Sequence, residues 1–304
     1  MTDRAALVTH ARDSIAKGSR SFALASKLFD TVTRERAWLL YSWCRKCDDI
    51  ADGQDHGGAL TAVDNPHERL AYLRSMTERA LAGDVTDEPA FDALGLVVQE
   101  CAIPHALPRD LIQGFAMDAD GFSPRTTEDL LTYCYHVAGV VGLMMAVIMG
   151  VSPDDEETLV HANDLGLAFQ LANIARDVRE DAEGGRCYIP ADWLVEFGIT
   201  KPFVSSPVET PGSARLCLDW AQHERMGLVA ARLAKMAGAC EASARIGAER
   251  LPFRSRWAVL AAAGIYGDIA RKVGKRGAAA WDSRVVTSGA GKAGWVAKAL
   301  MQAF

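Results

Sequence analysis

Helical periodicity of apolar residues runs through almost the whole chain, and the alternating pattern of β-strands is nearly absent. Ten stretches are expected to be helical: 4–17, 33–51, 66–82, 89–101, 107–119, 126–149, 154–182, 212–240, 252–273 and 291–303. The breaks that separate several of them are rich in Gly, Pro, Ser or Thr, at 53–66, 183–190, 201–212 and 274–291. None of these breaks is long or polar enough for an interdomain linker. The sequence therefore predicts one all-α domain over residues 1–304, with its site between facing helices.

The composition fits a helical domain in the cytoplasm. A chain of 304 residues with 49% hydrophobic side chains can bury a sizeable core. Its seven scattered cysteines indicate reduced thiols, and its N-terminus lacks the apolar stretch of an export signal. The longest near-apolar run, 137–151, is too short to span a bilayer. A net charge of −6 gives no electrostatic reason to expect a nucleic-acid partner.

The expected helix 33–51 carries acidic residues along one side near its end. Asp48 and Asp52 are four residues apart and project from the same face, and Arg45 lies one turn earlier on that stripe. Asp49 points about 100° away from the stripe. Like charges at this spacing destabilise a helix unless a cation lies between them. A solvated acidic face would explain this pattern taken alone.

A second oxygen-rich series, in the expected helix 154–182, makes a solvated face a poor explanation. Asn173, Asp177 and Asp181 step by four along the helix, and Gln170 extends the series by one turn. The residues around the series are apolar, which a solvated face does not need. Like the first series, this one contains an arginine, Arg176.

Two such series suit Mg²⁺ ions, or Mn²⁺ in their place, bridged to phosphate oxygens. Mg²⁺ binds through a few carboxylates together with substrate phosphate, and arginine binds phosphate through paired hydrogen bonds. The excess of acidic residues is then compatible with an anionic ligand, because the metal reverses the local charge. The sequence therefore predicts a metal-dependent diphosphate site.

The departure of diphosphate leaves a carbocation, which needs dry apolar walls and aromatic faces. The apolar stretch 133–149 is a candidate wall, in which Ala138, Gly139 and Gly142 would leave a groove. Packing between two helices through small residues explains the same pattern equally well. The aromatic candidates near the motifs are Phe22, Tyr41 and Tyr188.

Several of these segments resemble the squalene/phytoene synthase family. The residues that match one family signature are Leu165, Gly166, Gln170, Asn173, Ile174, Arg176, Asp177, Val178, Asp181, Arg186, Tyr188 and Pro190. Residues 133–142 are similar to a second signature, 18–22 to the N-terminal substrate motif, and 41–52 to the first aspartate-rich motif. The resemblance runs from about residue 10 to 272 and is strongest toward bacterial phytoene synthases, which serve carotenoid biosynthesis.

The resemblance implies a helical bundle of the class I isoprenoid synthase type with a central cavity. It also implies a prenyltransferase that condenses two molecules of geranylgeranyl diphosphate head to head, through prephytoene diphosphate, to phytoene and free diphosphate. No nicotinamide cofactor and no protein nucleophile are expected, and the proton acceptor is either diphosphate itself or a nearby tyrosine. Because substrate and product are greasy, we expect this cytoplasmic enzyme to make peripheral contact with the inner membrane.

The resemblance also implies roles for residues at matching positions. The metal would be held by Asp48, Asp49, Asp52, Asn173, Asp177 and Asp181, with Asp49 the weakest candidate. Substrate would be bound by Gly18, Ser19, Arg20, Ser21, Phe22, Tyr41, Arg45, Ala138, Gly139, Gly142, Gln170, Asn173, Arg176, Tyr188 and Tyr266. In this set a Ser19–Ser21 turn would hold diphosphate, together with Arg45, Gln170 and Arg176, and the cation would be bordered by Phe22, Tyr41, Tyr188 and Tyr266. A direct part in catalysis is implied for Tyr41, Arg45, Asp48, Asp52, Asp177 and Asp181.

Three alternatives stay open. A squalene or dehydrosqualene synthase would use the shorter farnesyl diphosphate, and a squalene synthase would also need NADPH. A class I terpene cyclase would apply the same metal chemistry to one substrate. A non-catalytic relative that acts as an assembly factor would be free to lose its aspartates, and both series are intact.

The C-terminal stretch departs from the family pattern. The family often has a tyrosine and a basic cluster there, whereas 281–288 reads Trp-Asp-Ser-Arg-Val-Val-Thr-Ser, so no role is carried over beyond Arg271. Residues 289–294 spell GxGxxG, but no strand is expected before them, so we expect a flexible loop rather than a nucleotide site. The last residues, 294–304, are apolar with one lysine and would either touch lipid or cap the core.

Overall fold

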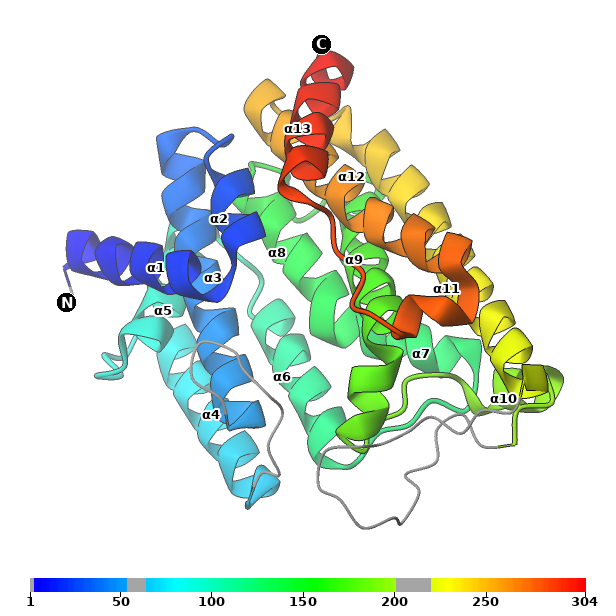
Figure 1. Cartoon of the computed structure of the whole chain (residues 1–304). Coiled ribbons are helices and arrows are strands. Elements are labelled where there is room, and N and C mark those ends of the chain that lie inside the picture. The colour runs from blue at the N-terminus through cyan, green and yellow to red at the C-terminus, as the bar shows by residue number, and fades with distance from the viewer. Residues whose placement is uncertain (1–2, 54–63, 201–219) are drawn as a thin grey trace.

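The computed structural model describes residues 3–53, 64–200 and 220–304, without the side chains of Arg20, Ser21 and residues 220–223. In these ranges the regular structure is helical, with no strand (Figure 1), which confirms the all-α prediction. The expected break at 201–212, most of the break at 53–66 and the start of the expected helix 212–240 lie outside the described residues. The same is true of the substrate contacts expected from the Arg20 and Ser21 side chains.

Most helices follow the expected ranges closely, but α2 and α10 lie outside all of those ranges. In chain order they are α1 (Arg4–Gly18), α2 (Arg20–Ser26), α3 (Thr31–Asp52), α4 (Pro66–Ala82), α5 (Pro89–Cys101), α6 (Ala106–Ala119), α7 (Thr127–Cys134), η1 (Tyr135–Gly139), α8 (Val140–Ile148), α9 (Glu156–Glu183), α10 (Ala191–Glu196), α11 (Trp220–Ala248), α12 (Phe253–Arg276), η2 (Gly277–Trp281) and α13 (Gly289–Ala303). The helix expected at 126–149 is divided by η1, which is a π turn, and η2 is a 3₁₀ turn. The helix expected to end at 240 continues to Ala248.

Two expectations about loops are wrong, for the same reason. Residues 19–21 are not a turn but the start of α2, where the Ser19 hydroxyl accepts a hydrogen bond from the Phe22 N–H at 3.2 Å. Residues 289–294 are not a flexible loop but the first turns of α13, where the Ser288 hydroxyl accepts one from the Gly291 N–H at 3.1 Å. Serine is a favoured N-cap residue, and in both places its hydroxyl caps the first turn of a helix where a turn or loop was expected. The break expected from Gly274 also begins late, because α12 runs on to Arg276.

Capping residues fix where α3 and α9, the two helices with acidic series, begin and end. Asp30 accepts a hydrogen bond from the Thr33 N–H at 3.0 Å, and Asp155 accepts one from the Thr158 N–H at 3.1 Å. α3 ends at Gly53, whose φ of 64° lies in the left-handed region that favours glycine. The aspartates of both series therefore lie in the last two turns of their helices, toward the negative end of the helix dipole.

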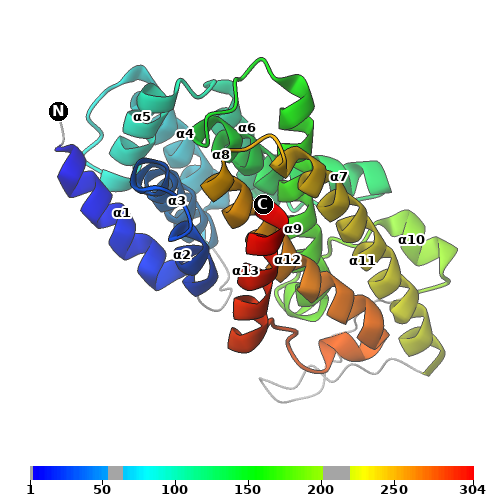
Figure 2. The ribbon, with the colours of Figure 1, turned by 90° about the horizontal axis from the view of Figure 1, so that it is seen from above.

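α9 lies in the middle of the bundle in both views (Figures 1 and 2) and packs against α8, α11, α12 and η1. Around it the apolar core is divided. Of the two larger clusters, one joins α1, α3, α4, α5, α6 and α8, and the other joins α7, α9, α11, α12 and η2. A smaller third cluster joins α3, α11, α12 and α13. The cavities described below are lined from both parts of the bundle, so the site lies where they meet.

One described segment, Thr127–Ile148, is long and apolar enough to cross a membrane by length and composition. It comprises α7, η1 and α8, and its residues belong to both larger apolar clusters of the bundle. A helix that is apolar around most of its circumference is expected when it is packed inside a protein. Packing between the two parts of the bundle therefore accounts for its composition.

Candidate active site

A polar cavity of about 530 Å³ lies between the C-terminal ends of α3 and α9. Of the predicted site residues it is lined by Asp48, Asp52, Gln170, Asn173, Arg176, Asp177, Asp181 and Tyr188. It is also lined by Asp118, Tyr133 and Arg186, for which no role was predicted. The two acidic series therefore face one shared volume.

The carboxylates of this cavity repel one another. Asp48 keeps 48% of its side-chain surface accessible, and its ion pair with Arg45 is loose, at 3.9 Å. Partial burial of this carboxyl is the main cause that raises its pKa to about 7, with Arg45 opposing the rise and Asp52 adding to it. Burial, with the neighbouring Asp177, raises the pKa of Asp181 to about 7 as well. Aspartates outnumber arginines in the lining of this cavity, and a bound cation would offset the excess negative charge.

Arginines from three segments reach these carboxylates. Arg186, which follows α9, donates a hydrogen bond to Asp52 of α3 at 2.7 Å and so joins the two walls. Asp177 Oδ1 accepts a hydrogen bond from Arg176 Nε at 2.7 Å, and Arg284 Nη2 lies 3.2 Å from the same oxygen. Asp177 is thereby held between two guanidinium groups, with 17% of its side-chain surface exposed.

A hydrogen-bonded group closes one side of the polar cavity. Asp118, near the end of α6, accepts hydrogen bonds from the hydroxyls of Tyr133 at 3.1 Å and Tyr188 at 2.9 Å. The two tyrosine rings stack with centroids 4.8 Å apart. Burial raises the pKa of Tyr133 and of Tyr188, so both hydroxyls keep their protons at neutral pH.

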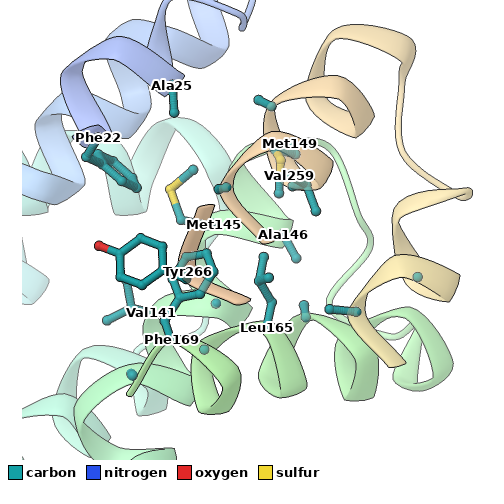
Figure 3. Close-up of a pocket in the computed structure, with 18 of the residues that line it drawn as sticks. Phe22, Ala25, Val141, Met145, Ala146, Met149, Leu165, Phe169, Val259 and Tyr266 are labelled. Atoms are coloured by element: carbon teal, nitrogen blue, oxygen red, sulfur yellow. The ribbon is translucent and has the colours of Figure 1, made fainter. Parts of the chain in front are cut away.

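An apolar cavity of about 340 Å³ adjoins the polar one (Figure 3), within the range of about 300–1,000 Å³ common for ligand pockets. The residues that line both cavities are Asp48, Leu111, Val137, Gln170 and Asn173. The other walls come mainly from α2, α8, α9, α11 and α12. Phe22 and Tyr266 line this space, and Tyr266 stacks on Phe169 with ring centroids 4.1 Å apart.

The small residues expected to form a groove have two different environments. Ala138 and Gly142 line the apolar cavity. Gly139 lines neither cavity, and a Cβ added there would collide with the Asn163 side chain of α9. A Cβ on Gly142 would likewise collide with the carbonyl oxygen of Ala162. Gly139 therefore packs η1 closely on α9 and does not line either cavity.

Several predicted residues lie beside the two cavities rather than in their lining: Gly18, Ser19, Tyr41, Arg45 and Asp49. Arg45 Nε donates a hydrogen bond to Asp49 at 2.9 Å, and both side chains line a separate pocket on another side of α3. Tyr41 stacks on Phe22 at a centroid distance of 5.6 Å, and a Cβ on Gly18 would collide with its hydroxyl. Asp49 therefore does not face the other carboxylates, and Tyr41 supports the ring of Phe22.

Four residues of the site carried no predicted role. Arg186 and Tyr133 lie in segments that match the family signatures, so a signal was present in the sequence. Asp118 ends the short motif GFAMD at 114–118. Arg284 had no such signal, because its partner Asp177 is more than one hundred residues away and its own segment is unlike the family pattern.

The oxygen donors of the cavity suit an open Mg²⁺ site better than a closed site in which protein side chains supply every ligand. Within residues 3–53, 64–200 and 220–304, no three His, Cys, Asp or Glu side chains converge closely enough to hold a metal ion by themselves. The carboxylates are instead spread over two walls of one cavity. Mg²⁺ typically takes one or two carboxylates and completes its coordination with water and phosphate, whereas structural zinc needs four close ligands.

A helical bundle with a carboxylate-lined cavity that adjoins an apolar one defines an isoprenoid synthase of the class I type. The chain belongs to the squalene/phytoene synthase family, whose model matches residues 15–290 and so extends past Arg271 to include Arg284. It is similar to 15-cis-phytoene synthase of Pantoea ananas, with 44% identity over 93% of this chain and 87% of that protein. Phytoene synthase of Pseudescherichia vulneris is 45% identical over 93% of this chain and 87% of its own. Among solved structures, a dehydrosqualene synthase in complex with ligand has a TM-score of 0.80 and 27% identity, over 97% of this chain and 96% of that one.

Proposed function

We propose that this chain is a phytoene synthase, a prenyltransferase that joins two molecules of geranylgeranyl diphosphate head to head through prephytoene diphosphate. Phytoene forms and both diphosphates are released. The observation that carries the proposal is the carboxylate-lined cavity that adjoins an apolar cavity, in a chain 44% identical to a 15-cis-phytoene synthase. The first suits the diphosphate heads, and the second suits the hydrocarbon tails.

Mg²⁺, with Mn²⁺ as a substitute, is the metal that the donor set supports. The residues that would hold it are Asp48, Asp52, Asn173, Asp177 and Asp181, which line the polar cavity from both walls. When bound, the metal neutralises phosphate charge and so makes diphosphate a better leaving group. Burial, together with neighbouring carboxylates, raises the pKa of Asp48 and of Asp181, and a bound cation would favour their charged forms, which supports this assignment.

Guanidinium groups bind and orient the diphosphates. Arg176 and Arg186 line the polar cavity, and Arg284 reaches its edge through the ion pair with Asp177. Because the planar guanidinium matches the spacing of phosphate oxygens, a bound diphosphate can take over hydrogen bonds that now go to carboxylates. Arg45 pairs loosely with Asp48, so it acts at the α3 wall from outside the cavity lining.

The apolar cavity excludes water from the carbocation. Phe22, Phe169 and Tyr266 present rings to its walls, where a π face stabilises positive charge. Burial raises the pKa of Tyr266, and the pKa of Tyr41 rises to about 12 for the same reason. Both hydroxyls therefore keep their protons at neutral pH, which supports departing diphosphate rather than a tyrosine as the proton acceptor.

The proposal includes a place of action. We propose one helical domain that works in the cytoplasm and touches the inner membrane peripherally, because the tails and the product dissolve in lipid rather than in water. The acidic net charge of −6 supports no nucleic-acid partner.

The test is incubation of the purified chain with Mg²⁺ and either geranylgeranyl or farnesyl diphosphate, with and without NADPH, followed by product mass. We expect a forty-carbon hydrocarbon from geranylgeranyl diphosphate without NADPH. A thirty-carbon product from farnesyl diphosphate alone would select a squalene or dehydrosqualene synthase, and a twenty-carbon product a terpene cyclase. A folded chain that binds diphosphate and turns over neither substrate would be a non-catalytic relative.

A further inference from the structure

The apolar cavity follows α9 for about half the length of that helix. Its lining on α9 consists of Asn173, Gln170, Phe169, Gly166, Leu165, Ala162, His161 and Thr158. Asn173 also lines the polar cavity, so it marks the end of the apolar cavity that lies next to the proposed diphosphate site. Thr158 marks the opposite end. Fifteen residues separate them, and at 1.5 Å per residue the span is about 22 Å long.

The far end of this cavity is enclosed by apolar and polar side chains. The apolar residues that line it and belong to one buried cluster are Phe29, Met149, Ala248, Leu251, Ala258 and Val259. Met149 and Val259 appear together at this end in Figure 3. The polar ones are Thr158, whose hydroxyl donates a hydrogen bond to Asp155 at 2.6 Å, and His161.

His161 is held in place by a hydrogen-bonded group between α9 and α11 that the proposed reaction does not use. Its Nδ1 lies 2.8 Å from the Ser243 hydroxyl oxygen, and that hydroxyl donates its proton to Asp164. The Ser243 oxygen therefore accepts a hydrogen bond from the imidazole N–H. Gly247 of α11 makes room for His161, because a Cβ there would collide with the Cβ of His161.

The span along α9 matches one tail length. With carbon–carbon bonds of about 1.5 Å, an extended isoprene unit is about 5 Å long, so three units reach about 15 Å and four about 20 Å. Ala162 lies eleven residues from Asn173, which is about 16 Å along the helix. Three units thus end at Ala162, and a fourth fills the space between Ala162 and Thr158.

We infer that the part of the apolar cavity from Ala162 to the hydrogen-bonded end at His161 and Thr158 selects tails of four isoprene units. A three-unit tail leaves this part empty and loses the burial of one unit. A five-unit tail has to displace side chains that their hydrogen bonds hold in place. The inference rests on the proposed function and adds to it the residues that set tail length.

Two substitutions shorten the cavity at the same depth from facing helices. Ala162→Phe fills it from α9. Val259→Phe fills it from α12. The stacked rings of Phe169 and Tyr266 set α9 and α12 at one level, and Ala162 and Val259 each lie seven residues before one of these rings. In either variant kcat/KM for geranylgeranyl diphosphate should fall by about 100-fold or more, while that for farnesyl diphosphate changes by less than about threefold.

The matched control is Val160→Phe, which adds a similar bulk to α9 at a residue that is 58% exposed and outside the cavity lining. It should keep the substrate preference of the unmodified chain. Thermal unfolding of all three variants shows which are folded, and the two shortened variants test the same depth independently.

Opening the far end should have the opposite effect. His161→Ala removes the ring that stands at the end of the lining, so this variant should produce a fifty-carbon hydrocarbon from a five-unit prenyl diphosphate that the unmodified chain does not use. Folded Phe variants that keep the preference for geranylgeranyl diphosphate would overturn the inference and leave the proposed function intact. Failure of the unmodified chain to make any forty-carbon product would instead overturn the proposed function.

Discussion

The two walls of the polar cavity carry similar acidic series but differ in what neutralises them. On the α9 wall, Asp177 is clasped by Arg176 and Arg284, and 17% of its side chain is exposed. On the α3 wall, Arg45 turns to Asp49, which leaves Asp48 with a loose ion pair and 48% of its side chain exposed. The same spacing in the sequence thus leaves Asp177 of one wall firmly paired and Asp48 of the other only loosely paired.

This difference indicates a division of labour between the walls. The α9 wall already contains guanidinium groups at hydrogen-bonding distance from an anion, so a phosphate can replace a carboxylate there with little rearrangement. On the α3 wall, the pKa of Asp48 is raised to about 7, and a bound cation would lower it by stabilising the charged carboxylate. Removing one carboxylate from each wall tests whether the two walls differ in this way.

The largest effect is expected on turnover. Asp48→Asn and Asp177→Asn should each lower kcat by about 1,000-fold or more, equivalent to about 4 kcal/mol of transition-state stabilisation, because each removes a charge from a wall of the proposed metal site. The measurement is phytoene formation at saturating Mg²⁺, with circular dichroism as the check on folding. Substantial activity in either purified variant would contradict the metal assignment of that wall.

A smaller loss of activity is expected when Arg284, the C-terminal arginine that contacts the α9 wall, is replaced. Arg284→Ala should lower kcat/KM for geranylgeranyl diphosphate by about tenfold to 100-fold, the range of about 1.4–3 kcal/mol for a charged hydrogen bond. Arg284→Lys should recover only part of the loss, because lysine lacks the paired donors. Full recovery by lysine would mean that Arg284 contributes charge alone.

Stability without metal should separate the two walls further. Asp177→Ala leaves Arg176, with 18% of its side chain exposed, without the carboxylate it now contacts, at a cost of about 1–3 kcal/mol. Asp48→Asn removes repulsion and should leave the free energy of unfolding unchanged or slightly higher. Urea denaturation in the presence of a chelator measures both, and equal losses in the two variants would show that the walls are equivalent.

The smallest expected effect is the response to Mg²⁺ alone. At ten times its dissociation constant, a ligand that binds only the folded chain stabilises it by about 1.4 kcal/mol. Asp48→Asn should reduce this shift, whereas Asp49→Asn, whose carboxylate lines a different pocket, should reduce it less. Thermal unfolding with and without Mg²⁺ gives the comparison, and the reverse order would place the metal on the other side of α3.

The sequence predicted those parts of the site that depend on one helix at a time. Asp48 and Asp52 share a face of α3, and Asn173, Asp177 and Asp181 share a face of α9, because residues four apart lie on one side of any α-helix. The helix ranges were predicted well for the same reason. Neither helix by itself indicates that the two faces line one cavity. That expectation was supported by the resemblance to a family.

Contacts between distant segments could not be predicted in this way. Arg186 reaches Asp52, and Arg284 reaches Asp177, across separations that leave no periodic pattern in the sequence. The roles of Gly139 and Gly142 were also not separable, since the π turn that precedes α8 changes the direction in which successive side chains point. One of these glycines lines the apolar cavity, and the other only brings two helices together.

Five residues line both cavities: Asp48, Leu111, Val137, Gln170 and Asn173. When a bond breaks beside them, the anionic fragment is well solvated only on the carboxylate-lined side, where the proposed Mg²⁺ would be held, and the hydrocarbon fragment only on the apolar side. Their recombination, and the capture of the cation by water, would each require a fragment to enter a medium that rejects it. The junction therefore sorts the two products by solubility toward opposite ends of α9, and makes the reaction hard to reverse at the moment it occurs.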